Sequence, residues 1–236
     1  MKKERVYGLD FFRGIAIIIM VIYHVLFSLV YVYGVDLEWF KSPYFNNIGA
    51  PLIGGTFTLI SGISTRYSRS VLKRGLQIFL WGMVMTVVTA VAVPDLIIMF
   101  GILHLMGSCM IIAALTQKYL DKIPIKIGLG VSLLLFMLTY QIPRTYFGIK
   151  NPYLFPFGLL TNNFYSSDYY PIIPWIFLFI AGTYLGIYVK EGKAPKFLYK
   201  SHSELIETIG RHTLWVYVLH QPIIVAVFWL LLRMFA

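Results

Sequence analysis

Long apolar runs dominate this sequence and leave few folds open to it. A helix that crosses a bilayer needs about 20 mostly apolar residues, and its backbone must form all of its hydrogen bonds internally. Hydrophobic residues make up 58% of the chain and charged residues 13%, whereas soluble domains have roughly 45–50% and about 25%. The sequence therefore predicts an all-α, polytopic protein of the cell membrane with about seven spans. The seven runs lie at 14–33, 48–65, 75–93, 97–117, 127–142, 171–189 and 212–232.

The basic residues indicate how these spans are oriented. The net charge is +10, and 16 of the 20 Lys and Arg residues fall in alternate connecting segments. Basic loops stay on the cytoplasmic side, so the pattern predicts an N-terminus inside and a C-terminus outside; an even number of spans would place the C-terminus inside. Clustering in short loops favours anionic lipid or an anionic cofactor as partner over nucleic acid. At this length, residues 1–236 are predicted to form a single transmembrane domain.

The segment 143–170, predicted to lie outside, differs from an ordinary loop. It contains three prolines and many aromatic residues, among them Tyr153 and Phe155. Two interpretations stay open. Aromatic residues favour the membrane interface, which suits an interfacial loop. In the second interpretation, the segment is a lid or a partly re-entrant loop over a cavity, since irregular backbone at membrane depth is tolerated where protein or water surrounds it.

Three histidines, His24, His104 and His220, lie within the predicted spans. An ionisable side chain at membrane depth is costly, which makes it a functional hypothesis. His24 follows Arg13 by 11 residues, or roughly 16 Å along a helix. Each histidine is either a neutral imidazole hydrogen-bonded between helices or a reactive group, and histidines paired across two helices would also suit haem. Neither HxxxH nor HExxH spacing occurs, so no metal site is predicted.

A charged pair marks the entry to the first span. Asp10 and Arg13 are three residues apart, and side chains at this spacing share one face of a helix. Arginine is suited to phosphate groups. The pair is therefore either a structural anchor of the helix end or a binding site for a phosphate-bearing cofactor.

These motifs resemble two related groups of membrane enzymes. The Arg13-x10-His24 spacing resembles the signature of integral-membrane acyltransferases that modify cell-surface glycans. The wider pattern resembles bacterial and archaeal relatives of the heparan-α-glucosaminide N-acetyltransferase catalytic domain, in that family's order and over most of the chain. Its blocks are Leu9-Asp10-Phe11-Phe12-Arg13-Gly14, Met20-Val21-Ile22-Tyr23-His24, Phe57-x2-Ile60-Ser61-Gly62-Ile63-Ser64, Phe100-Gly101-Ile102-Leu103-His104, Asp168-Tyr169-Tyr170-Pro171-x2-Pro174-Trp175 and Leu219-His220-Gln221-Pro222.

The resemblance implies transfer of an acyl group, most simply acetyl, from cytoplasmic acyl-CoA to a hydroxyl or amine of an extracytoplasmic sugar or glycan. His24 would act as general base or form an acyl-imidazole; His104 and His220 would orient it or polarise the thioester, and Asp168 would hold the acceptor. The implied CoA-binding residues are Asp10, Arg13, Arg66, Arg69, Lys73 and Arg74. The implied acceptor-binding residues are Tyr169, Trp175 and Gln221.

The chain also departs from both groups. The lysosomal heparan-α-glucosaminide N-acetyltransferases of the resembled family have more spans and a large lumenal region. Their catalytic histidine follows the first span, whereas the corresponding residues 34–47 of this chain contain no histidine. His24 therefore follows the O-acyltransferase pattern, and N- versus O-acylation stays open, as does completion of a seven-span core by a homodimer. Two other classes remain alternatives: a transporter or flippase for a glycolipid or small anion, suggested by the small-residue second span, and a haem-binding electron-transfer protein.

Overall fold

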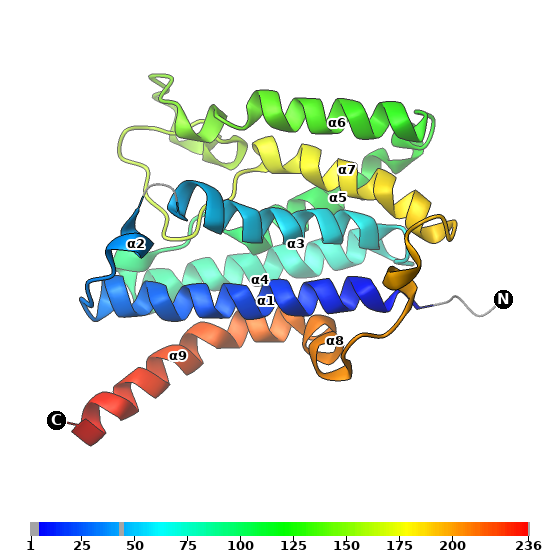
Figure 1. Cartoon of the computed structure of the whole chain (residues 1–236). Helices are drawn as coiled ribbons and strands as arrows, with labels where there is room; N and C mark the ends of the chain where they lie inside the picture. Colours follow the sequence, from blue (N-terminus) through cyan, green and yellow to red (C-terminus); the bar gives the residue numbers. More distant parts are fainter. Residues whose placement is uncertain (1–4, 43–44, 236) are drawn as a thin grey trace. The chain divides into compact units, whose positions relative to one another are not determined.

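The computed structural model describes residues 5–42 and 45–235 and is all-helical over that part of the chain (Figure 1). Lys2 and Lys3, which contribute to the predicted orientation, lie outside the described residues. Short π- or 3₁₀-helical turns occupy Ser28–Val32, Phe45–Gly49, Pro94–Leu96, Ile142–Arg144, Pro152–Phe157 and Lys196–Tyr199. The α-helices are α1 Tyr7–Phe27, α2 Glu38–Lys41, α3 Ala50–Thr65, α4 Val71–Ala92, α5 Ile102–Leu120, α6 Ile125–Thr139, α7 Ile172–Lys190, α8 Glu204–Arg211 and α9 Thr213–Phe235.

A helix occurs at each of the seven predicted spans, and five of the seven are long and apolar enough to cross a membrane. These five candidates are Tyr7–Val32, Val71–Ala92, Ile125–Arg144, Ile172–Lys190 and Thr213–Leu231. The other two helices fall short for different reasons. α3 has 16 residues, and α5 ends in the polar turn Gln117-Lys118. The all-α fold and the integral membrane location are confirmed; the count of seven and the orientation stay predictions.

Helix packing divides the chain into two units, one formed by residues 1–57 with 195–236 and the other by residues 58–194. In the first unit, α1 packs against α8 and along the start of α9 (Figure 1). The contact with α8 is close because it is made through two glycines. A Cβ atom on Gly14 would collide with the carbonyl oxygen of Ile206, and one on Gly210 would collide with the carbonyl oxygen of Asp10. Small residues are the usual means of bringing helices this close in lipid.

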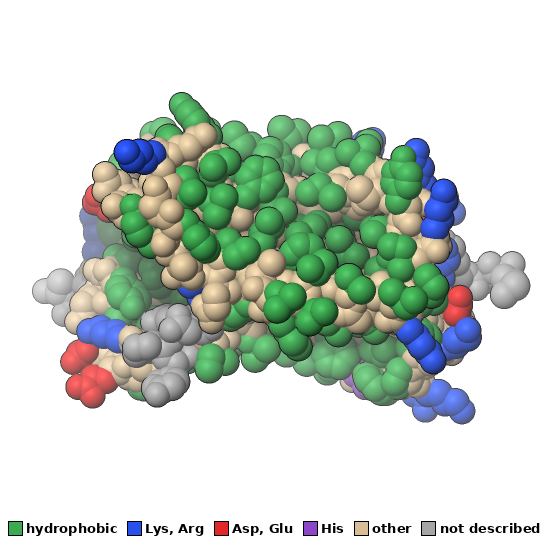
Figure 2. Space-filling view, turned by 90° about the horizontal axis from the view of Figure 1, so that it is seen from above, with side chains coloured by type: hydrophobic (Ala, Val, Ile, Leu, Met, Phe, Trp, Pro, Cys, Tyr) green, Lys and Arg blue, Asp and Glu red, His purple; other side chains and the backbone are tan. Residues whose placement is uncertain are grey.

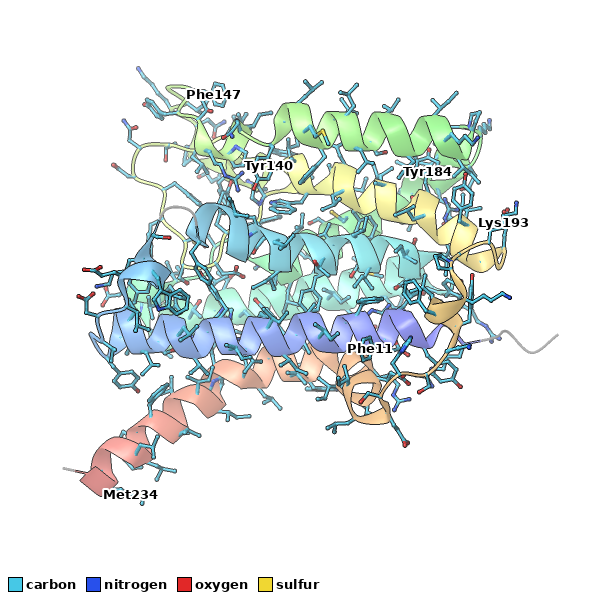
Figure 3. The ribbon with its side chains drawn as sticks, viewed as in Figure 1. Phe11, Tyr140, Phe147, Tyr184, Lys193 and Met234 are labelled. Atoms are coloured by element: carbon cyan, nitrogen blue, oxygen red, sulfur yellow. The ribbon has the colours of Figure 1, made fainter. Side chains whose placement is uncertain are left out.

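The second unit is held together in the same way. Gly62 on α3 and Gly182 on α7 lie against each other's helix backbones, where neither has room for a side chain. Tyr184 on α7 lies towards α6 (Figure 3), and its ring occupies the space that a side chain at position 128 would need. Its hydroxyl donates a 3.1 Å hydrogen bond to the carbonyl oxygen of Leu120. Side chains of α5 and α7 form the centre of this core, which contains Leu105, Cys109 and Phe179.

The segment 143–170 is tied to the residues before α5. Ser167 N donates to Ile97 O at 2.9 Å, Tyr170 N donates to Phe100 O at 2.9 Å, and Met99 N donates to Ser166 Oγ at 3.0 Å. The predicted span 97–117 therefore begins too early. Residues 97–101 precede the helix because their backbone pairs with this segment.

The side chains on the outside of the helices suit a lipid environment. Val91 on α4 is 79% exposed and Leu138 on α6 is 70% exposed. Figure 2 shows hydrophobic side chains covering the middle of the helices, with Lys and Arg side chains towards their ends. In water, an apolar surface this continuous would be an aggregation or binding site. In a membrane protein it is suited to contact with the acyl chains of lipids.

Replacing Gly210 by alanine is expected to destabilise the protein by about 1–3 kcal/mol, because the new methyl group overpacks the contact of α8 with α1. Gly130→Ala is the matched control: a Cβ there meets nothing within 4 Å, and alanine in a helix interior stabilises by up to about 1 kcal/mol. Thermal unfolding in detergent micelles measures both. Equal melting temperatures for Gly210→Ala and the native chain would refute the close contact.

Candidate active site

Two of the predicted histidines, His24 of α1 and His220 of α9, meet inside the first unit. Their ring centroids are 4.6 Å apart and the rings are inclined at 72°. His220 is 6% exposed and His24 is half-buried. Two imidazoles from helices at opposite ends of the sequence therefore face each other within candidate membrane spans.

The hydrogen bonds of these two rings determine which nitrogen carries the proton. His24 Nδ1 lies 2.9 Å from the carbonyl oxygen of Met20, and His220 Nδ1 lies against the carbonyl oxygen of Tyr217. A carbonyl oxygen can only accept, so in the neutral rings both Nδ1 atoms must be protonated. Each Nε2 then holds a lone pair, which makes it the basic atom of its ring.

Two acceptor atoms at this end of α9 lack a donor. Among the described residues, neither His220 Nε2 nor Gln221 Oε1 has a hydrogen-bond partner, although both atoms are buried. A buried acceptor without a donor costs about 1–3 kcal/mol, and such a group in a native fold often marks a functional site. A ligand hydroxyl, amine or amide would supply the missing donor.

Aromatic side chains form a wall beside His24. Tyr23 lies edge-on to His24 at 5.4 Å and packs against Phe40 of α2 and Phe45, with centroid distances of 5.3 and 6.1 Å. Phe40 is fully buried. The sequence reasoning missed this contribution from residues 34–47, and the cluster Trp39-Phe40 beside Phe45 is the signal that it overlooked.

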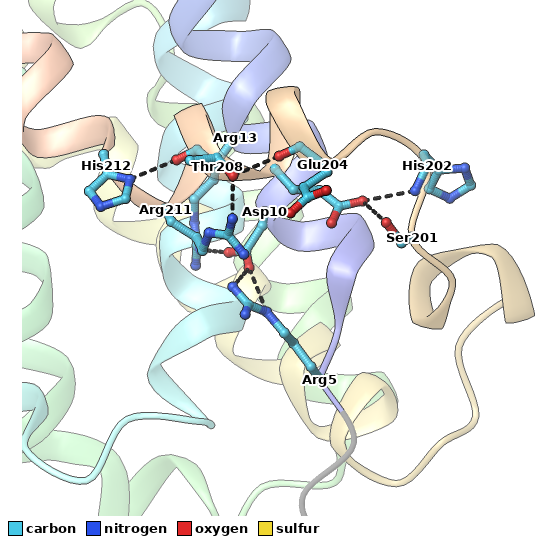
Figure 4. Close-up of polar contacts among 10 residues, drawn as sticks. Arg5, Asp10, Arg13, Ser201, His202, Glu204, Thr208, Arg211 and His212 are labelled. Carbon is cyan, nitrogen blue, oxygen red and sulfur yellow. Dashed lines mark hydrogen bonds and ion pairs between the residues drawn. The ribbon is translucent and has the colours of Figure 1, made fainter.

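A network of charges occupies the N-terminal end of α1 (Figure 4). Asp10 Oδ1 accepts from Arg13 Nη1 and Asp10 Oδ2 accepts from Arg5 Nη2, both at 2.8 Å. The predicted contact between Asp10 and Arg13 is confirmed, and Arg5 is an additional member of the network. Arg5 and Arg13 share the carboxylate of Asp10, and the carboxylate of Glu207 in α8 also acts on Arg5. The two arginines can bind a phosphate, because guanidinium groups offer several donors in a fixed fork.

In the second unit, Arg66 is buried among protein groups. Its Nη1 donates to Asp121 Oδ1 at 2.6 Å, its Nε donates to Thr183 O at 3.0 Å, and its side chain is only 7% exposed. A void of about 10 Å³ adjoins it, the size of one water molecule. These contacts tie Arg66 to α7, and among the described residues its buried Nη2 has no hydrogen-bond partner. The exposed basic side chains of this region are Arg69, Lys73 and Arg74.

His104 and Asp168 meet at the N-terminus of α5. Gly101 N donates to His104 Nδ1 at 3.2 Å, and Ile102 N donates to Asp168 Oδ2 at 3.1 Å. His104 Nε2 lies 3.4 Å from the hydroxyl of Thr86, so this ring has the opposite tautomer from the other two histidines. Backbone N–H groups at a helix start need such acceptors. The geometry therefore supports a capping role for both residues, and their catalytic roles stay predictions.

The three residues predicted to bind the acceptor substrate do not all lie in the same unit. Tyr169 donates its hydroxyl hydrogen to Phe155 O at 2.5 Å, and burial raises the pKa of its phenol. Trp175 is 4% exposed in the core, against Phe136. Gln221 adjoins His220 in the first unit. The structure thus brings His24, His220 and Gln221 into one unit and places Tyr169, Trp175, His104 and Asp168 in the other.

A comparison with protein families matches residues 5–222 to the catalytic domain of heparan-α-glucosaminide N-acetyltransferase. The chain belongs to this family. The match begins at Arg5 and extends to Pro222, so it includes the charged network of α1 and the His24–His220 pair. Comparisons with curated proteins and with solved structures found no match.

The family assignment makes this protein a membrane-bound acetyltransferase. Within residues 5–42 and 45–235, no three His, Cys, Asp or Glu side chains are grouped so as to hold a metal ion. The first unit places imidazoles within candidate spans and guanidiniums at the end of α1.

Glu207 fixes the helix that packs beside this charged network. Its carboxylate accepts from Ser201 Oγ and His202 N at 2.8 Å and from Ser203 N at 3.3 Å. Burial alone would raise the pKa of Glu207, but these hydrogen bonds outweigh it, and the pKa lies below its ordinary 4.5. The ionised carboxylate therefore stabilises the turn that leads into α8.

The hydrogen bonds of Glu207 predict that the stability of this protein depends on pH. The pKa of Glu207 is lower in the folded protein than in the unfolded chain, where it is 4.5. The carboxylate therefore contributes its full stabilisation of the folded state at a pH above 4.5 and loses it as the pH falls through the folded pKa. Glu207→Gln is expected to lower the melting temperature at neutral pH and to shrink the decrease on acidification below 4.5. Melting curves of both proteins from neutral to acid pH measure this, and parallel acid profiles would contradict it.

Proposed function

We propose that this protein transfers an acetyl group from cytoplasmic acetyl-CoA to an amine or hydroxyl of an extracytoplasmic glycan. The name of the matched family specifies an N-acetyltransferase acting on heparan-α-glucosaminide, which favours an amino sugar as acceptor. The observation that carries the proposal is the His24–His220 pair, in which both Nδ1 atoms are held by carbonyl oxygens and both Nε2 atoms are left basic.

The proposed reaction needs one base and one route for its proton. The acceptor nitrogen or oxygen attacks the thioester carbon, a C–N or C–O bond forms, and the C–S bond breaks. His24 Nε2 takes the proton from the acceptor and returns it to the leaving sulfur. General-base catalysis of this kind contributes about 10²–10⁴-fold. His220 takes part as the neighbouring imidazole, either by holding the attacking group or by sharing the proton.

The charged end of α1 is the proposed anchor for the CoA phosphates. Arg5 and Arg13 both form ion pairs with Asp10, and their guanidinium groups have further N–H donors that suit a phosphate. Arg69, Lys73 and Arg74 supply further exposed positive charge in the second unit. Arg66 is left out of the proposed set because its side chain is buried and two of its three guanidinium nitrogens already bind Asp121 and Thr183.

The membrane arrangement proposed here keeps all seven long helices as spans in one transmembrane domain. α3 and α5 would complete the five candidate spans, and the N-terminus would lie inside and the C-terminus outside. The bias of Lys and Arg supports this orientation. It places the charged end of α1 in the cytoplasm with acetyl-CoA and the segment 143–170 on the side of the glycan.

Loss of either imidazole is expected to abolish most acetyl transfer. His24→Ala and His220→Ala should each lower kcat by about 10²–10⁴-fold, and the double variant should be no slower than the slower single variant, because residues that act as a unit are not additive. His212→Ala, an exposed histidine outside the pair, is the control. Radiolabelled acetyl transfer to amino sugars measures all four. Full activity in His24→Ala would remove this residue from the mechanism.

Binding of CoA is expected to depend on Arg13. CoA should raise the melting temperature of the native protein, since a ligand that binds the folded state stabilises it. Arg13→Ala should weaken the apparent affinity about tenfold or more, because hydrogen bonds to charged groups are worth about 1.5–3 kcal/mol. Lys41→Ala, an exposed lysine predicted on the other side of the membrane, should leave the affinity unchanged. An identical CoA titration in Arg13→Ala would reject the phosphate anchor.

A further inference from the structure

We infer that the turn between α5 and α6, residues 118–127, binds the headgroup of an anionic phospholipid. Three lysines recur in this lysine turn at every fourth position, and all three side chains are exposed. Among the described residues, none of these lysines forms an ion pair. An exposed apolar or aromatic residue directly follows each lysine. The pairs are Lys118-Tyr119, Lys122-Ile123 and Lys126-Ile127, and the whole turn belongs to the second unit.

The exposed side chains of α6 place the lysine turn at the edge of the bilayer. Ile127, Val131, Leu134 and Leu138 are 57%, 49%, 55% and 70% exposed, and their spacing of three or four residues puts them on one face of the helix. This face suits acyl chains, and it ends beside Lys126 at the start of the candidate span Ile125–Arg144. A lysine at such a boundary lays its methylene stem along apolar surface and keeps its ammonium among the headgroups.

The acidic residues of the second unit leave the charge of the lysine turn unopposed. Residues 58–194 contain four of them, Asp95, Asp121, Asp168 and Glu191. Asp121 is paired with Arg66 at 2.6 Å, and Glu191 is paired with Lys193 at 2.8 Å. The other two lie beside the start of α5, a helix of 19 residues that separates them from the turn by roughly 28 Å. A phosphate at the turn therefore meets ammonium groups with no free carboxylate beside them.

The path of the lysine turn is fixed by neighbouring elements. Asp121 accepts from Arg66, which directly follows α3. The carbonyl oxygen of Leu120 accepts from the hydroxyl of Tyr184 on α7 at 3.1 Å, so the turn lies beside the last part of α7 (Figure 1). Within the turn, Lys122 N donates to the carbonyl oxygen of Tyr119 at 3.2 Å. Binding therefore has to order only side chains, which lowers its entropic cost.

The apolar half of the turn favours a lipid over a phosphate that arrives from water, such as those of CoA. Tyr119 is 59% exposed and Ile123 is 41% exposed, and a soluble phosphate would leave both uncovered. A phospholipid covers them with its glycerol and acyl groups while its phosphate meets the lysines. The ammonium of Lys118 lies 4.8 Å from the ring centroid of Tyr119, and tyrosine is a residue typical of the membrane interface.

The test compares two triple variants of the full-length protein in detergent micelles. The first replaces Lys118, Lys122 and Lys126 by glutamine. The matched control removes three exposed bases outside the turn, through Lys41→Gln, Arg144→Gln and Lys150→Gln. Native mass spectrometry measures the affinity for the tightest-bound phosphatidylglycerol, with phosphatidylcholine as the neutral probe.

The turn variant should bind phosphatidylglycerol about tenfold or more weakly than the native chain, since each base near an anionic lipid contributes about fivefold. The control should bind it as the native chain does, and phosphatidylcholine should bind all three proteins alike. Replacing the three lysines by arginine keeps the charge and should keep the affinity. Unchanged phosphatidylglycerol binding in the glutamine variant, or an equal loss in the control, would overturn the assignment.

Two competitors separate the lipid from other sources of phosphate. Glycerol phosphate in excess, which has the phosphate but no acyl chains, should not displace phosphatidylglycerol. The rise in melting temperature with CoA should be the same in the turn variant as in the native chain. Displacement by glycerol phosphate, or a loss of CoA binding in the turn variant, would show a general phosphate site and contradict the inference. Neither measurement involves acetyl transfer, so the inference stands or fails apart from the proposed function.

Discussion

Backbone-to-backbone contact at glycine is the constraint on which the rest of this structure depends. Lipid is as apolar as a leucine side chain, so helices in a membrane associate through close packing. In the first unit, Gly14 and Gly210 bring α1 and α8 together where neither has space for a methyl group. Gly14 immediately follows Arg13, so packing explains the small residue of the Asp10-x2-Arg13-Gly14 motif, and its two charged residues form an ion pair. Gly62 and Gly182 do the same for α3 and α7 in the second unit.

The need to satisfy every polar group in such a core also decides the chemistry of its histidines. An imidazole whose Nδ1 donates to a carbonyl of its own helix has satisfied its N–H group, and its Nε2 stays basic. His24 and His220 do this. His104 does the opposite, since its Nδ1 accepts from Gly101 N and caps α5. Three histidines that look alike in sequence therefore separate into a pair with a basic Nε2 and one residue that caps a helix, because of the partner of one nitrogen.

The sequence predicted those features that depend on residues close together in the chain. The apolar runs gave the long helices, and three-residue spacing gave the contact between Asp10 and Arg13. Residues 97–101 were misassigned to a helix because their partners, Ser166 to Tyr170, lie about seventy positions later in the chain. Arg66 was grouped with exposed bases because nothing near it in sequence reveals Asp121 as its partner. The path of the segment 143–170 was not predicted, since prolines and aromatics do not specify the long-range contacts that hold it.

Geometry also discriminates between the roles open to two membrane-embedded histidines. A haem iron with two axial imidazoles lies between their Nε2 atoms at roughly 2 Å from each, which separates the ring centroids by roughly 6 Å. The centroids of His24 and His220 are 4.6 Å apart, too close for a porphyrin between them. The same proximity suits an exchange of one proton between two bases. Acyl transfer needs a base that takes a proton from the acceptor and gives it to the leaving thiolate, and a basic imidazole nitrogen can do both.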